Sequence, residues 1–196
     1  MSDTILALEN LLSERDANEI LREGDFVHAS VMMILKENGQ SYSMLFIKRP
    51  ENERDPFSGH MAFPGGRMEG SDKSKLETAV RETIEEVGID INLSGRILGA
   101  LDDVNPNNPR ARNYLVTPYL SILNEEVTIK PDSNEVEKVI WVPMPHLNDD
   151  KNAQVRMRDR GGRLVKDYAY NYEQYIIWGM TGRILHQFLS FSAHLF

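Results

Sequence analysis

Residues 65–89 read GGRMEGSDKSKLETAVRETIEEVGI, and this stretch decides the fold. At about 100° per residue, the predicted helix carries one apolar stripe that we expect to face the core. The stripe consists of Leu76, Ala79, Val80, Thr83, Ile84 and Val87. Glu82 and Glu86 are i,i+4 neighbours beside it, and Glu85 lies one turn-step from Glu82. Like charges at this spacing cost about 0.2–0.5 kcal/mol per pair in an isolated helix. Mg²⁺ prefers carboxylate oxygens, waters and phosphates, so the helix is predicted to form one wall of a metal–phosphate site.

The bland alternative is a solvated, glutamate-rich helix face. On that interpretation Arg81 and Glu85 form an ordinary i,i+4 ion pair. The short pattern of Arg81 to Glu86 does not separate the two interpretations by itself. The preceding Phe63-Pro64-Gly65-Gly66 and the terminating Gly88 favour the metal site through the family resemblance that they carry.

With these residues the segment resembles the signature of the Nudix hydrolase family. In that signature a Gly-Gly loop leads into a helix that ends Arg-Glu-apolar-x-Glu-Glu-x-Gly-apolar. The matching residues are Gly65, Gly66, Arg81, Glu82, Glu85, Glu86, Gly88 and Ile89. Asp72 stands where an early Glu is expected, one additional residue precedes Arg81, and Thr83 replaces an aliphatic residue. The resemblance implies an α/β (α+β) fold, a Nudix-type α/β/α sandwich with a mixed central β-sheet.

Composition agrees with one enzyme domain. The 196 residues, 41% of them hydrophobic, are enough for one sizeable core. A net charge of −8 argues against a general nucleic-acid binder, since phosphate backbones are held by basic surfaces. The absence of cysteine excludes disulfides and a cysteine nucleophile. With no basic leader pattern and no 18-residue apolar run, we expect a cytoplasmic protein without a membrane partner.

Local patterns predict the remaining elements. Residues 3–22 read as an amphipathic helix stopped by Gly24, and residues 26–35 and 42–48 as a hairpin turning at 37–40. Further strands are expected at 61–63, 95–102, 113–122 and 137–142, with a hairpin over 154–159 and 163–169 and a final helix over 172–190. The expected organisation is an N-terminal helix (1–24) packed on a single Nudix hydrolase domain (25–190), with a C-terminal tail (191–196).

Outside the signature, the stretches 45–66 and 175–185 are similar to the coenzyme A diphosphatase branch of the family. This resemblance implies substrate contacts by Lys48, Arg49, Arg54, His60 and Gly66. Arg49 is the better anchor, because a guanidinium binds phosphate through two parallel hydrogen bonds. The alternative is that Lys48 and Arg49 pair with surface acids, and His60 is equally a structural loop residue.

The implied reaction is the attack of water on a diphosphate phosphorus. We assign Glu82 and Glu86 as ligands of Mg²⁺ or Mn²⁺, with Glu85 as a ligand or a neighbour that holds water. By resemblance the carbonyl of Gly65 is a backbone ligand, and Arg81 orients the glutamates. The general base is either one of these glutamates or Glu135, whose alternative is a solvated turn carboxylate.

The branch implies cleavage of coenzyme A or acyl-coenzyme A to 3′,5′-ADP and 4′-phosphopantetheine. Alternatives are another nucleoside diphosphate compound (ADP-ribose, a nucleotide sugar, NADH or another dinucleotide) and a non-catalytic nucleotide-binding module. The first helix either caps the core or contributes to a homodimer. Four tyrosines, at 168, 170, 172 and 175, either stack on a nucleobase or pack together, and Trp178 is expected in the core.

Overall fold

The central layer is a mixed β-sheet. The computed structural model describes residues 2–20, 26–52, 55, 57–105, 113–159, 162 and 164–196. The sheet strands are β1 (Val27–Asn38), β2 (Ser41–Lys48), β3 (Met61–Ala62), β4 (Gly65–Arg67), β5 (Gly95–Ala100), β6 (Tyr114–Leu123) and β7 (Lys138–Pro143). Their main order is β3-β2-β1-β6-β5, with β4 paired to β1 and β7 to β2. Among the described strands only the β1–β6 pair is parallel, so the sheet is mixed as predicted.

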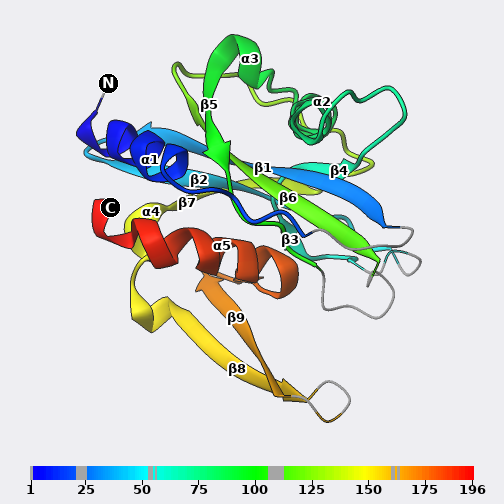
Figure 1. The fold of residues 1–196 in the computed structure, drawn as a ribbon, viewed down its shortest axis with the longest axis vertical. Coiled ribbons are helices and arrows are strands. Elements are labelled where there is room, and N and C mark those ends of the chain that lie inside the picture. The colour runs from blue at the N-terminus through cyan, green and yellow to red at the C-terminus, as the bar shows by residue number, and fades with distance from the viewer. Residues whose placement is uncertain are drawn as a thin grey trace.

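Helices cover both faces of this sheet (Figure 1). Successive residues of β1 point to opposite faces. Met33 and Leu35 join the core cluster that contains α1 (Asp3–Ser13) and α5 (Gly179–Ser192). Met32 and Ile34 join the cluster beneath α2 (Lys75–Val87). The predicted α/β/α sandwich is therefore confirmed.

Helix α2 is capped at both ends by residues of the signature. The Ser74 hydroxyl accepts a hydrogen bond from the Glu77 N–H, and Gly88 ends the helix in the left-handed conformation at φ 73°. The predicted apolar stripe is wrong at one position, because Ile84 is 42% exposed. Glu86 is buried instead, since its side chain turns back to the loop of Gly65.

The buried hydroxyl of Thr83 has a local partner. Its Oγ1 donates to the carbonyl oxygen of Ala79 at 2.7 Å, within the same helix. A threonine therefore fits where the family pattern has an aliphatic residue, because no polar atom is left unsatisfied.

The N-terminal helix is shorter than predicted. It ends at Ser13, and the backbone N–H groups of Asn18 and Ile20 donate to the carboxylates of Asp102 and Asp103. Those side chains give the backbone an alternative to helical hydrogen bonds, which ends the periodicity. Gly24 lies outside the described residues. Ile5, Leu8 and Leu12 of α1 are buried in the core, so this helix caps the sheet, while Leu6 is 50% exposed.

The predicted β1–β2 hairpin is confirmed, with a tighter turn. Asn38 pairs with Ser41, which leaves only Gly39 and Gln40 in the turn, and Gly39 has φ 64°. The strands expected near 95–102, 113–122 and 137–142 are β5, β6 and β7. Short helical segments, α3 (Ile91–Ser94), α4 (Met144–Leu147), η1 (Asp150–Asn152) and η2 (Ala193–Leu195), complete the described chain.

A second sheet follows the sandwich. It consists of β8 (Ala153–Asp159), β9 (Leu164–Tyr172) and β10 (Tyr175–Ile177) in antiparallel order. The β8–β9 hairpin extends away from the body of the molecule (Figure 1). Gly162 belongs to its turn region, whereas Gly161 lies outside the described residues.

The final helix begins later than predicted, at Gly179. Tyr172 pairs with Tyr175 across a two-residue turn, where Glu173 has φ 51°. The aromatic and β-branched residues before Gly179 therefore continue a sheet instead of opening a helix. Helix α5 runs through Ser192. The division into residues 1–24, 25–190 and 191–196 stays a prediction. None of the described helices is both long and apolar enough to span a bilayer.

Candidate active site

The Gly-Gly loop and helix α2 meet through the two glutamates that are four residues apart. The Gly65 N–H donates to Glu86 Oε2 at 2.9 Å. Gly66 lies against the carboxylate of Glu82, so closely that an added Cβ would overlap the carboxylate atoms. A Cβ at Gly65 would instead overlap the backbone carbonyl of Ser30 on β1. Both glycines are therefore needed for close approach, the first to the sheet and the second to a carboxylate.

Glu86 is the most buried of the signature glutamates. Its side chain is 1% exposed, and burial raises its pKa to about 8 from the usual 4.5. Burial also raises the pKa of Glu82. A carboxylate removed from water without a full positive partner is costly, and a bound cation would supply that partner.

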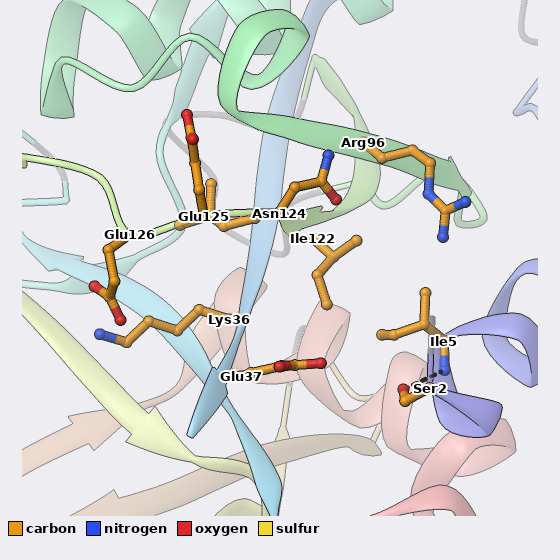
Figure 2. A pocket seen from close by; sticks show the side chains of 10 residues that line it. Ser2, Ile5, Lys36, Glu37, Arg96, Ile122, Asn124, Glu125 and Glu126 are labelled. Atoms are coloured by element: carbon orange, nitrogen blue, oxygen red, sulfur yellow. Dashed lines mark hydrogen bonds between the residues drawn. The ribbon is translucent and has the colours of Figure 1, made fainter. Parts of the chain in front are cut away.

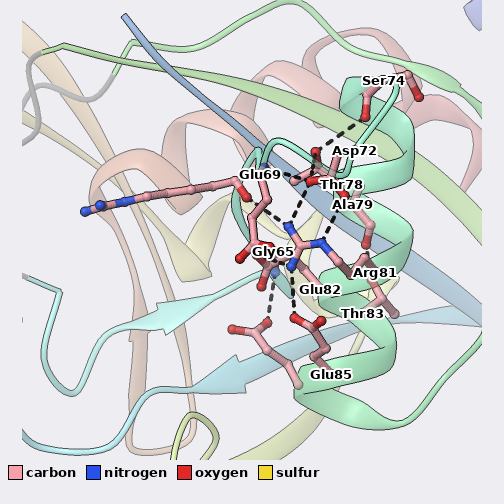
Figure 3. A network of polar contacts seen from close by, with 12 residues as sticks. Gly65, Glu69, Asp72, Ser74, Thr78, Ala79, Arg81, Glu82, Thr83 and Glu85 are labelled. Carbon is pink, nitrogen blue, oxygen red and sulfur yellow. Dashed lines mark hydrogen bonds and ion pairs between the residues drawn. The ribbon is translucent and has the colours of Figure 1, made fainter.

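Arg81 connects the other two glutamates to the loop (Figure 3). Its Nη1 contacts Glu82 at 3.0 Å and Glu85 at 2.9 Å, and its Nη2 donates to the Arg67 carbonyl at 2.9 Å. Its Nε and Nη2 donate to the two oxygens of Asp72, each at 3.0 Å. One guanidinium thus fixes both carboxylates relative to the loop.

Asp72 is the residue at which the sequence departs from the family pattern. Its carboxylate is almost fully buried and accepts hydrogen bonds from Arg81, from the Glu69 N–H and from the Thr78 hydroxyl. The bond to Arg81, followed by that from Glu69, holds the pKa of Asp72 well below its usual value. An aspartate in this loop therefore serves as the anchor of Arg81.

The donor set suits a hard divalent cation. The negative charge of Glu82 adds to the burial that raises the pKa of Glu86, and the loop brings the backbone of Gly65 to Glu86. Among the described residues, no three such side chains converge closely enough to hold an ion as they stand. Glu82 and Glu85 each turn one carboxylate oxygen toward Arg81, so the second oxygen of each would have to face the ion.

The lead-in places a cation beside the glutamates. Arg49 follows β2, and its Nη1 lies 3.9 Å from Glu86 Oε1. The same guanidinium donates twice to Asp55 Oδ2, at 2.9 and 3.1 Å. Although burial opposes it, the hydrogen bonds from the Phe57 N–H and from Arg49 lower the pKa of Asp55. Arg49 therefore reaches the predicted metal site while its guanidinium is hydrogen-bonded to Asp55.

The other residues of the lead-in are placed less directly. Lys48 Nζ pairs with Glu137 and lies 3.9 Å from Glu51. These acids are the surface partners that the alternative interpretation expected. His60 accepts a hydrogen bond at its carbonyl from the Arg49 N–H at 3.0 Å. Arg54 lies outside the described residues.

The charge of Glu135 acts on the signature glutamates. This residue is exposed and precedes β7, in a loop whose Asp132 N–H donates to the carbonyl of Glu86. Besides burial, the negative charge of Glu135 contributes to the raised pKa of both Glu82 and Glu86. This places its carboxylate within electrostatic range of the two glutamates.

A comparison with known families assigns this arrangement. The family model of the NUDIX domain matches residues 26–160. The chain belongs to the Nudix hydrolase family. The matched range contains the Gly-Gly loop, α2, Arg49 and Glu135, and it ends before β9, β10 and α5.

Individual Nudix proteins extend the comparison. The chain is 35% identical to the Nudix hydrolase NudL of Photorhabdus laumondii over 130 residues, covering 66% of this chain and 67% of that protein. It is 26% identical to the peroxisomal coenzyme A diphosphatase NUDT7 of Mus musculus over 185 residues, covering 86% and 75%. Two other curated relatives are longer, and the chain spans 32% and 55% of their length. A MutT/nudix family protein of Enterococcus faecalis shares the fold, with a TM-score of 0.56 and 16% identity over 97% of this chain and 74% of that one.

The Nudix site is separate from a pocket of about 610 Å³ beside Lys36 and Glu37 of β1 (Figure 2). Its lining mixes the cations Lys36 and Arg96 with the acids Glu37, Glu125 and Glu126. None of the predicted site residues that the structure describes lines it.

The sequence did not indicate the positions of two residues near the Nudix site, Asp55 and Trp178. Asp55 holds Arg49, but a single acid in an irregular loop carries no periodic signal. Trp178 was expected in the core, yet it is only half-buried and its ring lies 4.6 Å from that of His60. The resemblance of 175–185 to a closing helix was the signal available, and it did not indicate where the indole points.

Proposed function

We propose that this Nudix hydrolase cleaves the diphosphate bond of coenzyme A or acyl-coenzyme A, giving 3′,5′-ADP and 4′-phosphopantetheine. The observation that carries the proposal is the approach of Arg49, from the lead-in that resembles the coenzyme A diphosphatase branch, to the buried Glu86. This juxtaposition puts a phosphate-binding cation beside carboxylates suited to a metal.

Glu82 and Glu86 would hold Mg²⁺ or Mn²⁺ with the carbonyl of Gly65, and Glu85 would hold the ion or a water. The Nudix family is typically dependent on a divalent metal. Such an ion supplies charge for the diphosphate oxygens and lowers the pKa of a bound water. Arg81 contacts Glu82 and Glu85 and keeps them aligned, which makes it a positioning residue.

Arg49 and a basic carboxylate would complete the site. The Arg49 guanidinium would bind a diphosphate oxygen on the side opposite Asp55. A signature glutamate or Glu135 would take the proton from the attacking water, because these carboxylates lie within electrostatic reach of one another. Water can attack phosphorus directly, so no covalent enzyme intermediate is required.

The coenzyme A assignment has two supports. The lead-in and the 175–185 stretch resemble that branch, and the murine coenzyme A diphosphatase aligns over 86% of this chain. Hydrolysis of ADP-ribose, a nucleotide sugar or NADH would use the same groups.

The test is product analysis by chromatography and mass spectrometry, with Mg²⁺ or Mn²⁺ present. The panel holds coenzyme A, acetyl-coenzyme A, dephospho-coenzyme A, ADP-ribose, NADH and a nucleotide sugar, and a Glu86→Gln preparation controls for contaminating phosphohydrolases. We expect preferred cleavage of coenzyme A and poor cleavage of dephospho-coenzyme A, which lacks the 3′-phosphate. Faster cleavage of ADP-ribose or NADH would overturn the substrate and keep the chemistry. No cleavage of any member would favour the binding module.

A further inference from the structure

We infer that Trp178, with His60 beside it, forms the surface on which the nucleobase of the substrate stacks. This inference rests on the proposed function and adds a base-recognition site to it. The indole of this site comes from the C-terminal segment, which lies beyond the residues that the family model matches, and His60 comes from the lead-in.

The contact joins two distant segments of the chain. Trp178 precedes α5 directly and follows β10, which packs near β3. His60 precedes β3, and the two ring centroids are 4.6 Å apart with an interplanar angle of 56°. The ring of Phe57 also lies near His60, with the two ring centroids 6.3 Å apart in an edge-to-face arrangement. All three residues are half-buried, so each keeps part of its surface accessible to solvent.

The position relative to the metal site fits a nucleotide. The Arg49 N–H donates to the His60 carbonyl at 3.0 Å, while the Arg49 guanidinium lies 3.9 Å from Glu86. One arginine side chain therefore spans the separation between the backbone of His60 and the predicted metal ligands. A ribose and its 5′-phosphate give a comparable separation between a base and a diphosphate bond. A base on Trp178 would then leave its phosphates at Arg49 and Glu86.

Chemistry favours Trp178 over the tyrosines for this contact. Tyr170 and Tyr175 are buried in the core, and Tyr168 stacks on His186 of α5. Trp178 offers the largest aromatic face, and stacking on it requires no hydrogen-bond pattern from the base. Burial lowers the pKa of His60, which favours the neutral ring that completes the surface.

Fluorescence tests the contact without any need for hydrolysis. The chain has two tryptophans, so Trp141→Phe leaves Trp178 as the only indole. Trp141 lies on β7 against Lys36 and serves as the internal control. In Trp141→Phe, with Mg²⁺ present, we expect 3′,5′-ADP to quench the fluorescence of Trp178 saturably. Ribose 5-phosphate, which has no base, should leave this fluorescence unchanged. The matched variant Trp178→Phe, which retains Trp141, should show no quenching by 3′,5′-ADP.

Kinetics supply the second measurement. Trp178→Ala should raise the KM for coenzyme A roughly tenfold, with kcat within about twofold of wild type, because stacking holds substrate and transition state alike. Trp178→Phe should give an intermediate KM, since a smaller ring remains.

The two proposals fail separately. Cleavage of coenzyme A with no quenching of Trp141→Phe, or with equal quenching in both variants, would overturn the base-stacking site and keep the proposed function. Quenching that requires Trp178, in a protein that cleaves none of the panel, would keep the base site and overturn the diphosphatase.

Discussion

The two sides of the candidate site are held in different ways. On the side of α2, Gly65 binds Glu86 and Arg81 binds Glu82 and Glu85, and the most important carboxylate is buried. On the side of the lead-in, Arg49 and Lys48 are part-exposed cations whose partners are acids of nearby loops.

This difference separates a fixed geometry from an exchangeable one. Part-exposed ion pairs contribute about 0–1 kcal/mol each, so Arg49 and Lys48 can turn toward a substrate phosphate at little cost. A buried carboxylate cannot return to water, so Glu86 keeps its place whether or not a cation is bound. We expect changes on the α2 side to abolish turnover and changes on the lead-in side to weaken binding.

The largest effect is expected from Glu86→Gln. The amide keeps the shape and the acceptor for the Gly65 N–H but removes the charge that would hold the metal. Turnover should fall by at least about a thousandfold, measured as kcat on the best substrate of the panel.

A matched control keeps this result specific. Glu126→Gln makes the same change on the exposed rim of the pocket and should leave kcat unchanged. Circular dichroism melting should show both variants folded. Substantial turnover by folded Glu86→Gln would contradict the assignment of Glu86 as a metal ligand.

The next effect compares the two glycines of the loop. Gly66→Ala places a methyl group against the flexible end of Glu82, so the carboxylate must move while the backbone stays. We expect kcat to fall about ten- to a hundredfold, with a change in unfolding free energy below about 1 kcal/mol. Gly65→Ala instead meets the backbone of Ser30 and should destabilise the fold by about 2 kcal/mol or more.

Chemical denaturation and kinetics on the same two preparations distinguish these outcomes. If both variants lost stability equally while Gly66→Ala kept its kcat, the close packing of Gly66 on Glu82 would have no role in the site.

A smaller effect is expected from Arg49→Lys. Lysine keeps the charge but loses the planar fork that contacts Asp55 and approaches Glu86. KM should rise about tenfold, with a smaller fall in kcat. Arg156→Lys, on the exposed strand β8, is the matched control. An unchanged KM in Arg49→Lys would remove Arg49 from the substrate contacts.

Local sequence predicted the end of α2 and the first hairpin well, because these depend on neighbouring residues such as Gly88 and Gly39. It failed where the deciding contact is distant. Helical periodicity assigned Ile84 to the core and could not show Glu86 turning back to Gly65. The site partners Asp55 and Trp178 depend on how the lead-in and the C-terminal sheet pack, which no local pattern encodes.

The same contrast predicts that the unfolding free energy of the metal-free protein depends on pH. Its effect on turnover is the smallest of those predicted, because turnover is measured with saturating metal, which suppresses it. The folded protein keeps the proton of Glu86 up to about pH 8, whereas the unfolded chain releases it near 4.5. The folded state thus binds more protons between these values, so this group's contribution to the unfolding free energy falls as pH rises from about 4.5 to 8. Each pH unit contributes at most about 1.4 kcal/mol.

Urea unfolding of metal-free protein across this pH range should show the loss of unfolding free energy, and Glu86→Gln should abolish it. Mg²⁺ or Mn²⁺ should reduce it in the wild type, because an ion on the carboxylate takes the place of the proton. Parallel pH profiles for wild type and Glu86→Gln would mean that the pKa of Glu86 is not raised in the folded, metal-free protein, and that Arg49 compensates for its burial.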